Sequence, residues 1–326
     1  VLASVSGGKR FRALMAHVGY ALSSGTALDQ VSLPHLSASL ELYQASALVH
    51  DDIIDKADER RGMPTPHRTL AHHHASSSWI GSSTDFGRHA AILVGDFLFS
   101  AATAAADEQA LTLREDCARA FARRFADMHA EVALGQYLDI TAEQTPLDPQ
   151  RTDALSTSDS LEVALHKSAH YSVVHPAILG AICGASTFDG VAELLAVLET
   201  ILTPWGLAFQ LRDDDLGVFG DPTVTGKPAG DDLREGKRTA LLALTWEASS
   251  PAERRALTDV LGVVEASAEQ IATATDIVAR NGRAAHEAEI ARLVADGDAA
   301  LEASTFDEDA RAMLRELCSI LTARRA

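Results

Sequence analysis

Apolar residues recur every three to four positions over most of the chain, which is the spacing of an amphipathic helix. The segment His35–Arg61 contains neither Gly nor Pro and keeps this spacing. The same pattern predicts three further helices: Leu161–Ala185, Pro204–Val218 and Asp307–Ala326. Alternation typical of strands is hard to find, and aromatic residues make up only 5% of the chain. The pattern therefore predicts an all-α protein.

Helix boundaries are marked by local chemistry. Pro204 suits the first turn of a helix, where its missing N–H is not needed, and Gly217 and Gly220 suit the end of that helix. Ser250 and Glu253 stand three residues apart around a Pro, which is a capping-box pattern at the start of another helix.

Three segments rich in Gly, Pro, Ser, Asp or His are predicted to be loops: His72–Gly87, Thr141–Ser160 and Gly220–Lys237. None is typical of an interdomain linker, and no repeat of solenoid period is visible, so residues 1–326 are predicted to form a single domain. His72, His73 and His74 resemble a metal-binding tract. Their predicted loop offers no ligands at helical spacing, which favours solvated histidines instead.

Composition narrows the class of protein. The 326 residues carry 28 basic and 46 acidic side chains, a net charge of −18, which argues against a nucleic-acid binder. No apolar run reaches the roughly 18 residues of a membrane span, since Asp96 interrupts the most apolar stretch. No export signal is visible, and three scattered cysteines predict neither a disulfide framework nor a metal knot. We expect a soluble, cytoplasmic protein.

Lysine is rare, and its positions are informative. Only five lysines occur, and three of them lie beside glycine: Lys9, Lys227 and Lys237. A compact ammonium group next to a flexible backbone suits the oxygens of a phosphate group.

Adjacent aspartates mark a second kind of site. Asp51, Asp52 and Asp55 follow the apolar and small residues of one predicted helix, at positions i, i+1 and i+4. Carboxylates clustered at the end of a buried helix favour Mg²⁺, which binds through a few carboxylates and substrate phosphates. Arg60 and Arg61 follow closely, and paired guanidinium groups suit a diphosphate.

A second helix repeats this arrangement. Gln210 precedes Asp213 and Asp214 by three and four residues, so all three share one helical face below an apolar stretch. Two such helices facing each other would form an apolar pit with opposed carboxylates at its rim.

Six segments together resemble the trans-isoprenyl diphosphate synthase (polyprenyl synthetase) family. In chain order they are Gly7–Arg12, Leu48–Asp55, Arg60–Gly62, Gly135–Asp139, His166–Ala169 and Phe209–Asp214. The resemblance covers nearly the whole chain. It implies an all-α bundle of antiparallel helices around a central cavity, a homodimer, and condensation of isopentenyl diphosphate with an allylic diphosphate.

The resemblance also assigns residues. The Mg²⁺ ions, three per site, are implied to bind Asp51, Asp52, Asp55, Asp213 and Asp214. The allylic diphosphate is implied to contact Arg60, Lys167, Ser168, Gln210, Lys227 and Lys237. The isopentenyl diphosphate is implied to contact Lys9, Arg12, Gln44 and Arg61. The released pyrophosphate is implied to accept the proton, with His50 as a competing candidate that is more simply explained as a packed side chain.

Three departures from the family pattern are visible. The fifth position of the second aspartate motif is Gly217 instead of Asp, a pattern similar to longer-chain members. Asp215, in the middle of that motif, is unusual, which puts a metal role for it in doubt. The chain begins almost at the first motif, where relatives carry a further helix, so we expect a leader that is missing here.

Product length should follow the depth of the pit. Ser46 and Ala47, five and four residues before Asp51, are too small to block it. Tyr43 lies eight residues before Asp51, roughly 12 Å deeper at 1.5 Å per residue, and is the predicted floor. We expect geranylgeranyl diphosphate, with longer products if Tyr43 points elsewhere and other chain lengths as the alternative.

Other functions stay open. A class I terpene cyclase shares the first aspartate cluster and the helical fold, but it needs no second phosphate pocket such as Lys9, Arg12 and Arg61 provide. A metal-dependent phosphohydrolase of the His-Asp type could use His50 and Asp51, yet its further histidine ligands are not recognisable. A non-catalytic partner subunit is least favoured because both carboxylate clusters are intact.

Overall fold

The computed structural model describes residues 10–60, 62–220, 230–263 and 265–322. Contacts divide the chain into two compact units. The first unit consists of Val1–Phe125 and Pro176–Leu194, and the second of Ala126–His175 and Leu195–Ala326. Each is described by itself below, and the single-domain organisation stays a prediction.

The described residues are mostly helical, which confirms the predicted all-α class. Their helices are α1 (Phe11–Ser24), η2 (Leu28–Gln30), α2 (Pro34–Ile54), α3 (Pro66–Ser76), α4 (Ser83–Ala110), α5 (Glu115–Gln144), η3 (Thr152–Ala154), α6 (Thr157–Ala164), η4 (Leu165–Val174), α7 (His175–Gly184), α8 (Phe188–Phe219), α10 (Asp231–Glu235), α11 (Ala240–Ala248), α12 (Pro251–Thr258), α13 (Ala268–Asn281), α14 (Arg283–Ala303) and α15 (Glu308–Thr322). Among the described residues, the strands are β1 (Glu59–Arg60) and β2 (Met63–Pro64), which pair antiparallel.

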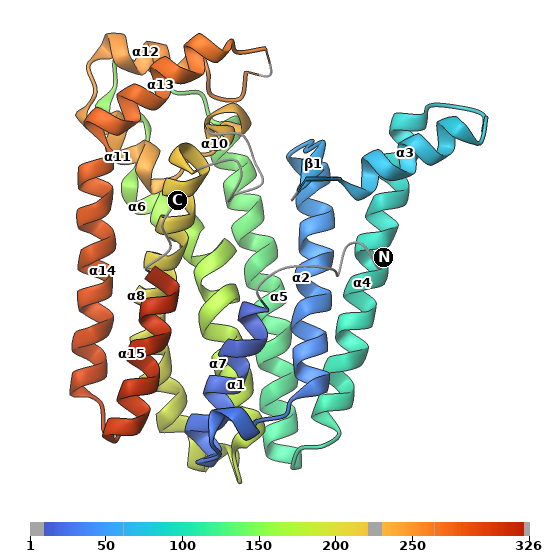
Figure 1. Ribbon diagram of the computed structural model, residues 1–326, viewed down its shortest axis with the longest axis vertical. Helices are drawn as coiled ribbons and strands as arrows, with labels where there is room; N and C mark the ends of the chain where they lie inside the picture. Colours follow the sequence, from blue (N-terminus) through green and yellow to red (C-terminus); the bar gives the residue numbers. More distant parts are fainter. Residues whose placement is uncertain (1–9, 61, 221–229, 264, 323–326) are drawn as a thin grey trace. The chain divides into compact units, whose positions relative to one another are not determined.

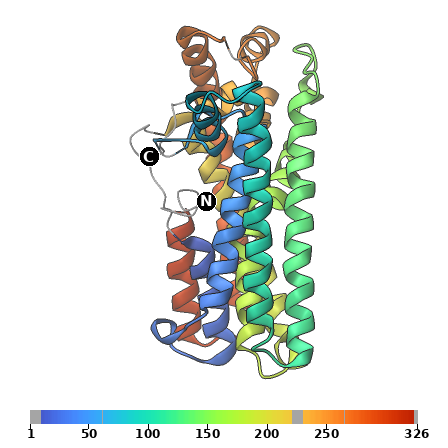
Figure 2. The same cartoon turned by 90° about the vertical axis from the view of Figure 1, so that its right-hand side faces the viewer.

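The first unit is built on α2 and α4, which run antiparallel and side by side (Figures 1 and 2). Their shared core contains Ala45, Val49, Ala91 and Leu98, all buried. Small side chains at the contact let the two helices approach closely, and this holds the carboxyl end of α2 in a fixed position.

The second unit has its core among α8, α11, α12 and α13, around the fully buried Trp246. The predicted capping box at Ser250 and Glu253 is confirmed: each side chain accepts a hydrogen bond from the backbone N–H of the other residue. Helices α14 and α15 follow as an antiparallel pair (Figure 1).

Three predicted boundaries are wrong. Pro204 does not begin a helix but lies inside α8, because buried Leu198, Leu202 and Trp205 keep one apolar face continuous across it. A proline there removes one backbone hydrogen bond, which this packing outweighs. Gly217 also lies inside α8, which ends at Phe219, so the predicted stop at Gly220 is confirmed and the one at Gly217 is wrong.

The helix predicted over His35–Arg61 ends at Ile54, since Lys56 adopts a left-handed conformation with φ of +56°. The histidine tract was predicted in a loop, yet His72, His73 and His74 lie on α3. Pro66 at its start favours this helix, and His74 is buried beside Phe86, so the tract is not simply solvated.

The loops predicted over Thr141–Ser160 and Gly220–Lys237 are shorter than expected. Helix α5 continues to Gln144, α6 begins at Thr157, and α10 occupies Asp231–Glu235. Helices α4 and α8 are long and apolar enough to cross a membrane by length and composition alone. Core helices of soluble proteins pass the same test, so this is weak evidence, and the absence of a membrane span stays a prediction.

Candidate active site

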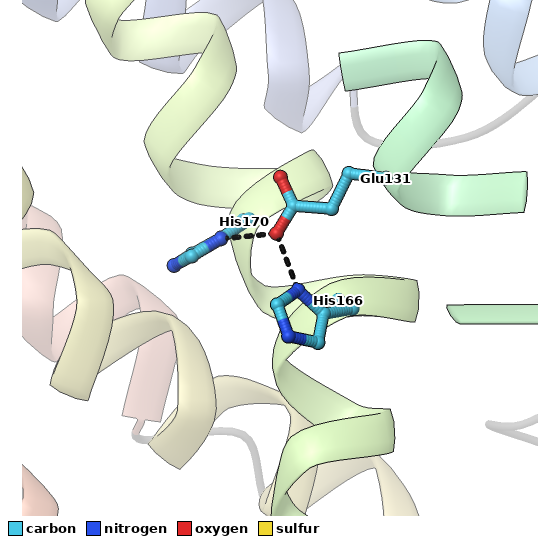
Figure 3. A group of neighbouring side chains, drawn as sticks. All are labelled: Glu131, His166 and His170. Carbon is cyan, nitrogen blue, oxygen red and sulfur yellow. Dashed lines mark hydrogen bonds and ion pairs between the residues drawn. The ribbon is translucent and has the colours of Figure 1, made fainter. Parts of the chain in front are cut away.

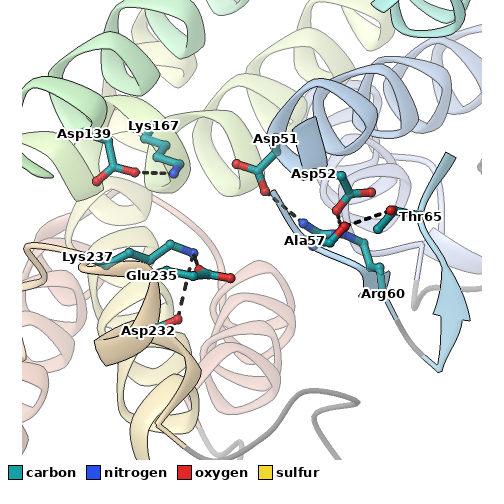
Figure 4. Close-up of polar contacts among 10 residues, drawn as sticks. All are labelled: Asp51, Asp52, Ala57, Arg60, Thr65, Asp139, Lys167, Asp232, Glu235 and Lys237. Carbon is teal, nitrogen blue, oxygen red and sulfur yellow. Dashed lines mark hydrogen bonds and ion pairs between the residues drawn. The ribbon is translucent and has the colours of Figure 1, made fainter. Parts of the chain in front are cut away.

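The first carboxylate cluster lies at the end of α2. Asp51 and Asp52 occupy its last turn, and Asp55 is its C-terminal cap. Arg60, on β1, reaches back to both: its Nε donates to Asp52 Oδ1 at 2.5 Å and its Nη2 to Asp51 Oδ2 at 3.0 Å (Figure 4). The short β1–β2 hairpin makes this return possible, with Gly62 at φ of +70° in its turn.

Arg60 offsets part of the negative charge of the three carboxylates. Burial opposes its positive charge, but the carboxylates of Asp52, Asp51 and Asp55 raise its pKa above the ordinary value. Asp52 is only 2% exposed, so this pairing takes place in a poorly hydrated environment. A guanidinium held among three carboxylates is well placed to bind a diphosphate that arrives with a divalent cation.

Three side chains of α2 face α4. The ring of Tyr43 meets Phe99 edge to face at 6.0 Å between centroids, and Ser46 Oγ donates to the carbonyl oxygen of Gly95 at 2.8 Å. His50 packs against the same glycine, where a Cβ would come within 2.2 Å of its Nε2. His50 thus lies against α4 within the first unit, as expected of a packed side chain.

Ala47 is one helical turn before Asp51 on α2 and half-buried. Eight residues at 3.6 per turn place Tyr43 about 80° around the helix from Asp51, so the two point in different directions. The role of Tyr43, Ser46 and Ala47 in setting product length stays a prediction.

The second cluster lies on α8 and confirms the expected helical spacing. Gln210 Nε2 donates to Asp214 Oδ1 at 2.8 Å, and Asp213 precedes it on the same helix. A third carboxylate comes from α10: Asp232 lies so close to Gly217 that a Cβ there would be 2.0 Å from its Oδ2. The family pattern has Asp at this position of α8, whereas this chain has Gly217. The carboxylate of Asp232 occupies the space that a side chain at position 217 would fill.

Crowding of these carboxylates is visible in their electrostatics. Burial raises the pKa of Asp214 to about 8, and the neighbouring charge of Asp232 adds to the shift. Because carboxylate oxygens that repel one another at a buried site are the ligands of a hard divalent cation, Asp213, Asp214 and Asp232 fit Mg²⁺.

Lys167 lies on η4 and is paired across to α5. Its Nζ donates to Asp139 Oδ2 at 2.5 Å (Figure 4). Gly135, one turn before Asp139, lets the two segments touch, because a Cβ there would lie 2.4 Å from the backbone nitrogen of Lys167. Ser168 follows Lys167 on η4 and is half-buried. The sequence identified Lys167 but not its partner. Asp139 is the last residue of the Gly135–Asp139 segment, which was the available signal.

Lys237 follows α10 and is held by its own neighbours. Its Nζ lies 2.5 Å from Glu235 Oε2 and 3.9 Å from Asp232 Oδ1 (Figure 4). Sequence reasoning missed both acidic partners as site residues. The Asp231–Asp232 adjacency was the available signal for one of them.

The remaining predicted residues are placed as follows. Arg12 lies in the first turn of α1 and Gln44 on α2, both half-buried. Lys9, Arg61 and Lys227 lie outside the described residues. Asp215 is 4% exposed and accepts two hydrogen bonds from Arg283, at 2.9 and 3.0 Å, so its carboxylate is paired with that guanidinium group.

Comparison with known proteins gives consistent matches. The sequence model of a family described as Polyprenyl synthetase matches residues 2–278. The chain is 32% identical over 279 residues to the geranylfarnesyl diphosphate synthase of Aeropyrum pernix, covering 85% of this chain and 77% of that protein. It is also 32% identical over 322 residues to the geranylgeranyl diphosphate synthase of Mycobacterium tuberculosis, covering 97% and 81%.

A solved structure is similar as well. The geranylgeranyl pyrophosphate synthase of Corynebacterium glutamicum, crystallised with isoprenyl diphosphate and magnesium, matches with a TM-score of 0.87 and 37% identity, covering 99% of this chain and 90% of that one. These matches confirm the resemblance that the six sequence segments indicated.

Proposed function

Because the chain belongs to the polyprenyl synthetase family and is a trans-prenyltransferase, we propose that it extends an allylic diphosphate with isopentenyl diphosphate to geranylgeranyl diphosphate. The observation that carries this proposal is the likeness to the Corynebacterium enzyme over almost the whole chain. The two carboxylate clusters, each beside a paired cation, supply the groups that such a reaction needs.

The chemical problem is the breakage of an allylic C–O bond, which leaves negative charge on the departing diphosphate. Arg60, Lys167 and Lys237 bind that charge, and Gln210 holds the carboxylate of Asp214 in position. In the free chain these cations are neutralised by carboxylates, Arg60 by Asp52 and Lys167 by Asp139. Binding of a diphosphate therefore exchanges the carboxylate partners of these cations for phosphate oxygens. The released carboxylates and the diphosphate together need added positive charge.

Mg²⁺ fits the carboxylate sets described above. Asp51, Asp52 and Asp55 would hold it in the first unit, and Asp213, Asp214 and Asp232 in the second. When bound, Mg²⁺ supplies positive charge that stabilises the leaving diphosphate. We propose that three ions are bound. The isopentenyl diphosphate is assigned to Arg12, Gln44, Lys9 and Arg61, and the released pyrophosphate takes up the proton.

Product length is proposed to depend on α2. Ser46 and Ala47 leave room near the first cluster, and Tyr43, backed by Phe99, is the first large side chain further along. We propose that this aromatic pair, roughly 12 Å along the helix from Asp51, limits the growing chain at the twenty-carbon product.

A homodimer is proposed on the basis of one surface. Leu93 and Phe97 are 67% and 60% exposed on α4, and Ile92 and Phe99 beside them are 42% and 38% exposed. A run of large apolar side chains along one helix is typical of an interface. A second copy of this chain is the proposed partner, and the assembly is proposed to be soluble and cytoplasmic. Light scattering of Phe97→Glu should report monomers where the unaltered protein reports dimers.

One assay tests the reaction. The purified protein is incubated with labelled isopentenyl diphosphate and dimethylallyl, geranyl or farnesyl diphosphate, with and without Mg²⁺, and products are separated by chain length. We expect Mg²⁺-dependent growth that stops at the twenty-carbon product.

Two variants serve as a matched pair in that assay. Asp51→Asn should abolish growth, whereas Asp58→Asn should not, because Asp58 is an exposed surface residue paired with Arg68. Cyclised products without use of isopentenyl diphosphate would establish a terpene cyclase instead. Release of inorganic phosphate without growth would establish a phosphohydrolase.

A further inference from the structure

Three histidines converge on one carboxylate in the second unit, and none of these four residues is assigned above to substrate or Mg²⁺. Glu131, on α5, accepts hydrogen bonds at its Oε1 from His166 Nδ1 at 2.7 Å and His170 Nδ1 at 2.5 Å. Its Oε2 accepts from His175 Nε2 at 2.6 Å. Figure 3 shows the rings of His166 and His170 directed at the same oxygen of Glu131.

The convergence depends on an unusual winding of the chain. His166 and His170 lie on η4, which is a π-helix, and His175 closes it with an N–H bond to the carbonyl oxygen of His170. In an α-helix the nine residues from His166 to His175 would span about two and a half turns and put the two on opposite faces. With i→i+5 bonds they span about two turns, which brings all three histidines to the face that meets Glu131.

The ligand atoms suit a borderline transition metal. One oxygen of Glu131 and the Nδ1 atoms of His166 and His170 lie within 4.8 Å of one another, the one such group among the described residues. Two imidazoles and a carboxylate are a set that Zn²⁺ prefers and that Mg²⁺ does not. Ligands of tetrahedral zinc stand about 3.3 Å apart, so the Glu131–His170 pair has to open by only about 0.8 Å.

Exposure and protonation are both compatible with an ion. The side chains of Glu131, His166 and His170 are 19%, 28% and 23% exposed, so the group is sheltered but reachable from solvent. Burial would raise the pKa of Glu131, yet the hydrogen bonds from His170, His175 and His166 outweigh it and hold that pKa below its usual range. Coordination through Nδ1 needs each ring proton on Nε2, so the protons shared with Glu131 move to the other nitrogens.

We propose that Glu131, His166 and His170 form a Zn²⁺ site that ties α5 to η4, with His175 orienting Glu131 through its second oxygen. Lys167 lies between the two histidine ligands in the sequence and meets Asp139 of the same α5. The ion would thus fix the segment that presents Lys167, as a structural site separate from the Mg²⁺ chemistry. This site does not depend on the identity of the prenyl product.

The test is metal binding by the whole protein in millimolar Mg²⁺, which occupies the aspartate clusters. We expect one Co²⁺ per chain with the visible absorption of tetrahedral coordination, displaced by Zn²⁺. Zn²⁺ at one hundred times its Kd should raise the Tm by about 4 °C for a chain of this length. Each readout is independent of catalysis, so it stands even if the proposed product is wrong.

Variants decide the assignment. His170→Gln keeps a hydrogen-bond donor for Glu131 but removes a ligand, so its Zn²⁺ affinity should fall by at least about 100-fold; Glu131→Gln should behave alike. His175→Gln should cost about 10- to 100-fold, as expected of a residue that orients a ligand. His73→Ala, at an exposed position of α3, is the control and should bind as the unaltered protein does.

The metal-free Tm of each variant, measured with a chelator, shows whether it has folded, and His166→Gln replaces any variant that has not. Unchanged Zn²⁺ affinity in the folded His170→Gln or His166→Gln protein overturns the proposal. The proposal is equally wrong if Zn²⁺ gives no stabilisation of the unaltered protein, or if the His73→Ala change abolishes binding.

Discussion

The contact between Gly217 and Asp232 permits a sharp test of how the second carboxylate cluster is assembled. The change is Gly217→Ala, which adds one methyl group inside α8. That methyl would stand 2.0 Å from Asp232 Oδ2 and 2.4 Å from its Cγ. Since ordinary contact begins near 3.4 Å, the carboxylate has to move away by about 1.4 Å.

The expected magnitudes separate stability from metal binding. Alanine in a helix interior is favoured over glycine by about 0.5–1 kcal/mol, and an off-rotamer side chain at Asp232 costs about 0.5–1.5 kcal/mol. The free energy of unfolding should therefore change by less than about 1 kcal/mol. Displacing one oxygen ligand should weaken Mg²⁺ binding by about 10- to 100-fold, or about 1.4–2.7 kcal/mol.

The assay is the Mg²⁺ concentration that gives half-maximal condensation, with calorimetry on the same samples. Gly190→Ala is the control, since it makes the same change near the start of α8 beside Thr187 and far along the helix from Asp214. Asp232→Asn, which removes charge without adding volume, should reproduce the weaker Mg²⁺ dependence. A half-maximal Mg²⁺ concentration that is unchanged in both Gly217→Ala and Asp232→Asn would refute the assignment of Asp232 as a ligand.

Three further predictions concern other parts of the chain. Tyr43→Ala should lengthen the product by at least one isoprene unit, because it removes the ring, packed against Phe99, that is proposed to limit the growing chain. Chromatography of the products measures this, and an unchanged length would contradict the proposed floor. Lys167→Gln should lower kcat/KM for the allylic diphosphate by about 10- to 150-fold, as expected for a lost bond to a charged group, with KM for isopentenyl diphosphate little altered; equal losses for both substrates would argue against this role. His286 is fully buried, neither ring nitrogen has a hydrogen-bond partner among the described residues, and burial lowers its pKa from 6.5 to about 4. The unfolded chain keeps the ordinary histidine pKa of 6.5, so it takes up the proton at a higher pH than the folded chain does. The free energy of unfolding should therefore fall by about 3 kcal/mol as the pH drops from 6.5 to 4, and His286→Leu should remove that loss in denaturant titrations.

Local pattern was enough to predict the fold class and some of the helices. Apolar spacing identified α2, the second half of α8 and α15, and the Ser250 capping box is where the sequence put it. These succeed because the information is contained within a few adjacent residues, and the interactions they predict are formed between neighbours in the chain.

The errors have a shared physical cause, which is that tertiary contact overrides a local signal. Pro204 is a helix breaker by itself, yet buried residues on both sides keep α8 continuous. Gly217 was interpreted as a stop, but its lack of a side chain makes room for Asp232.

Pairings between distant residues could not be predicted at all. Lys167 and Asp139 are 28 positions apart, and Arg283 reaches Asp215 across 68. The convergence of His166 and His175 was equally hidden, since α-helical periodicity puts them on opposite faces. The chemistry of the site was therefore visible in the sequence as residue types, while the partner of each charge came only from the structure.

The π-helical winding of η4 gives this part of the chain an unusual sensitivity to length. Loss of a single residue between Leu165 and Val174 would let the segment relax to ordinary α-helical winding. Side chains beyond the deletion would then turn by about 80° around the axis, which would carry His175 away from Glu131. Natural variation here should thus be confined to substitutions, and a one-residue gap should be as damaging as a change of charge.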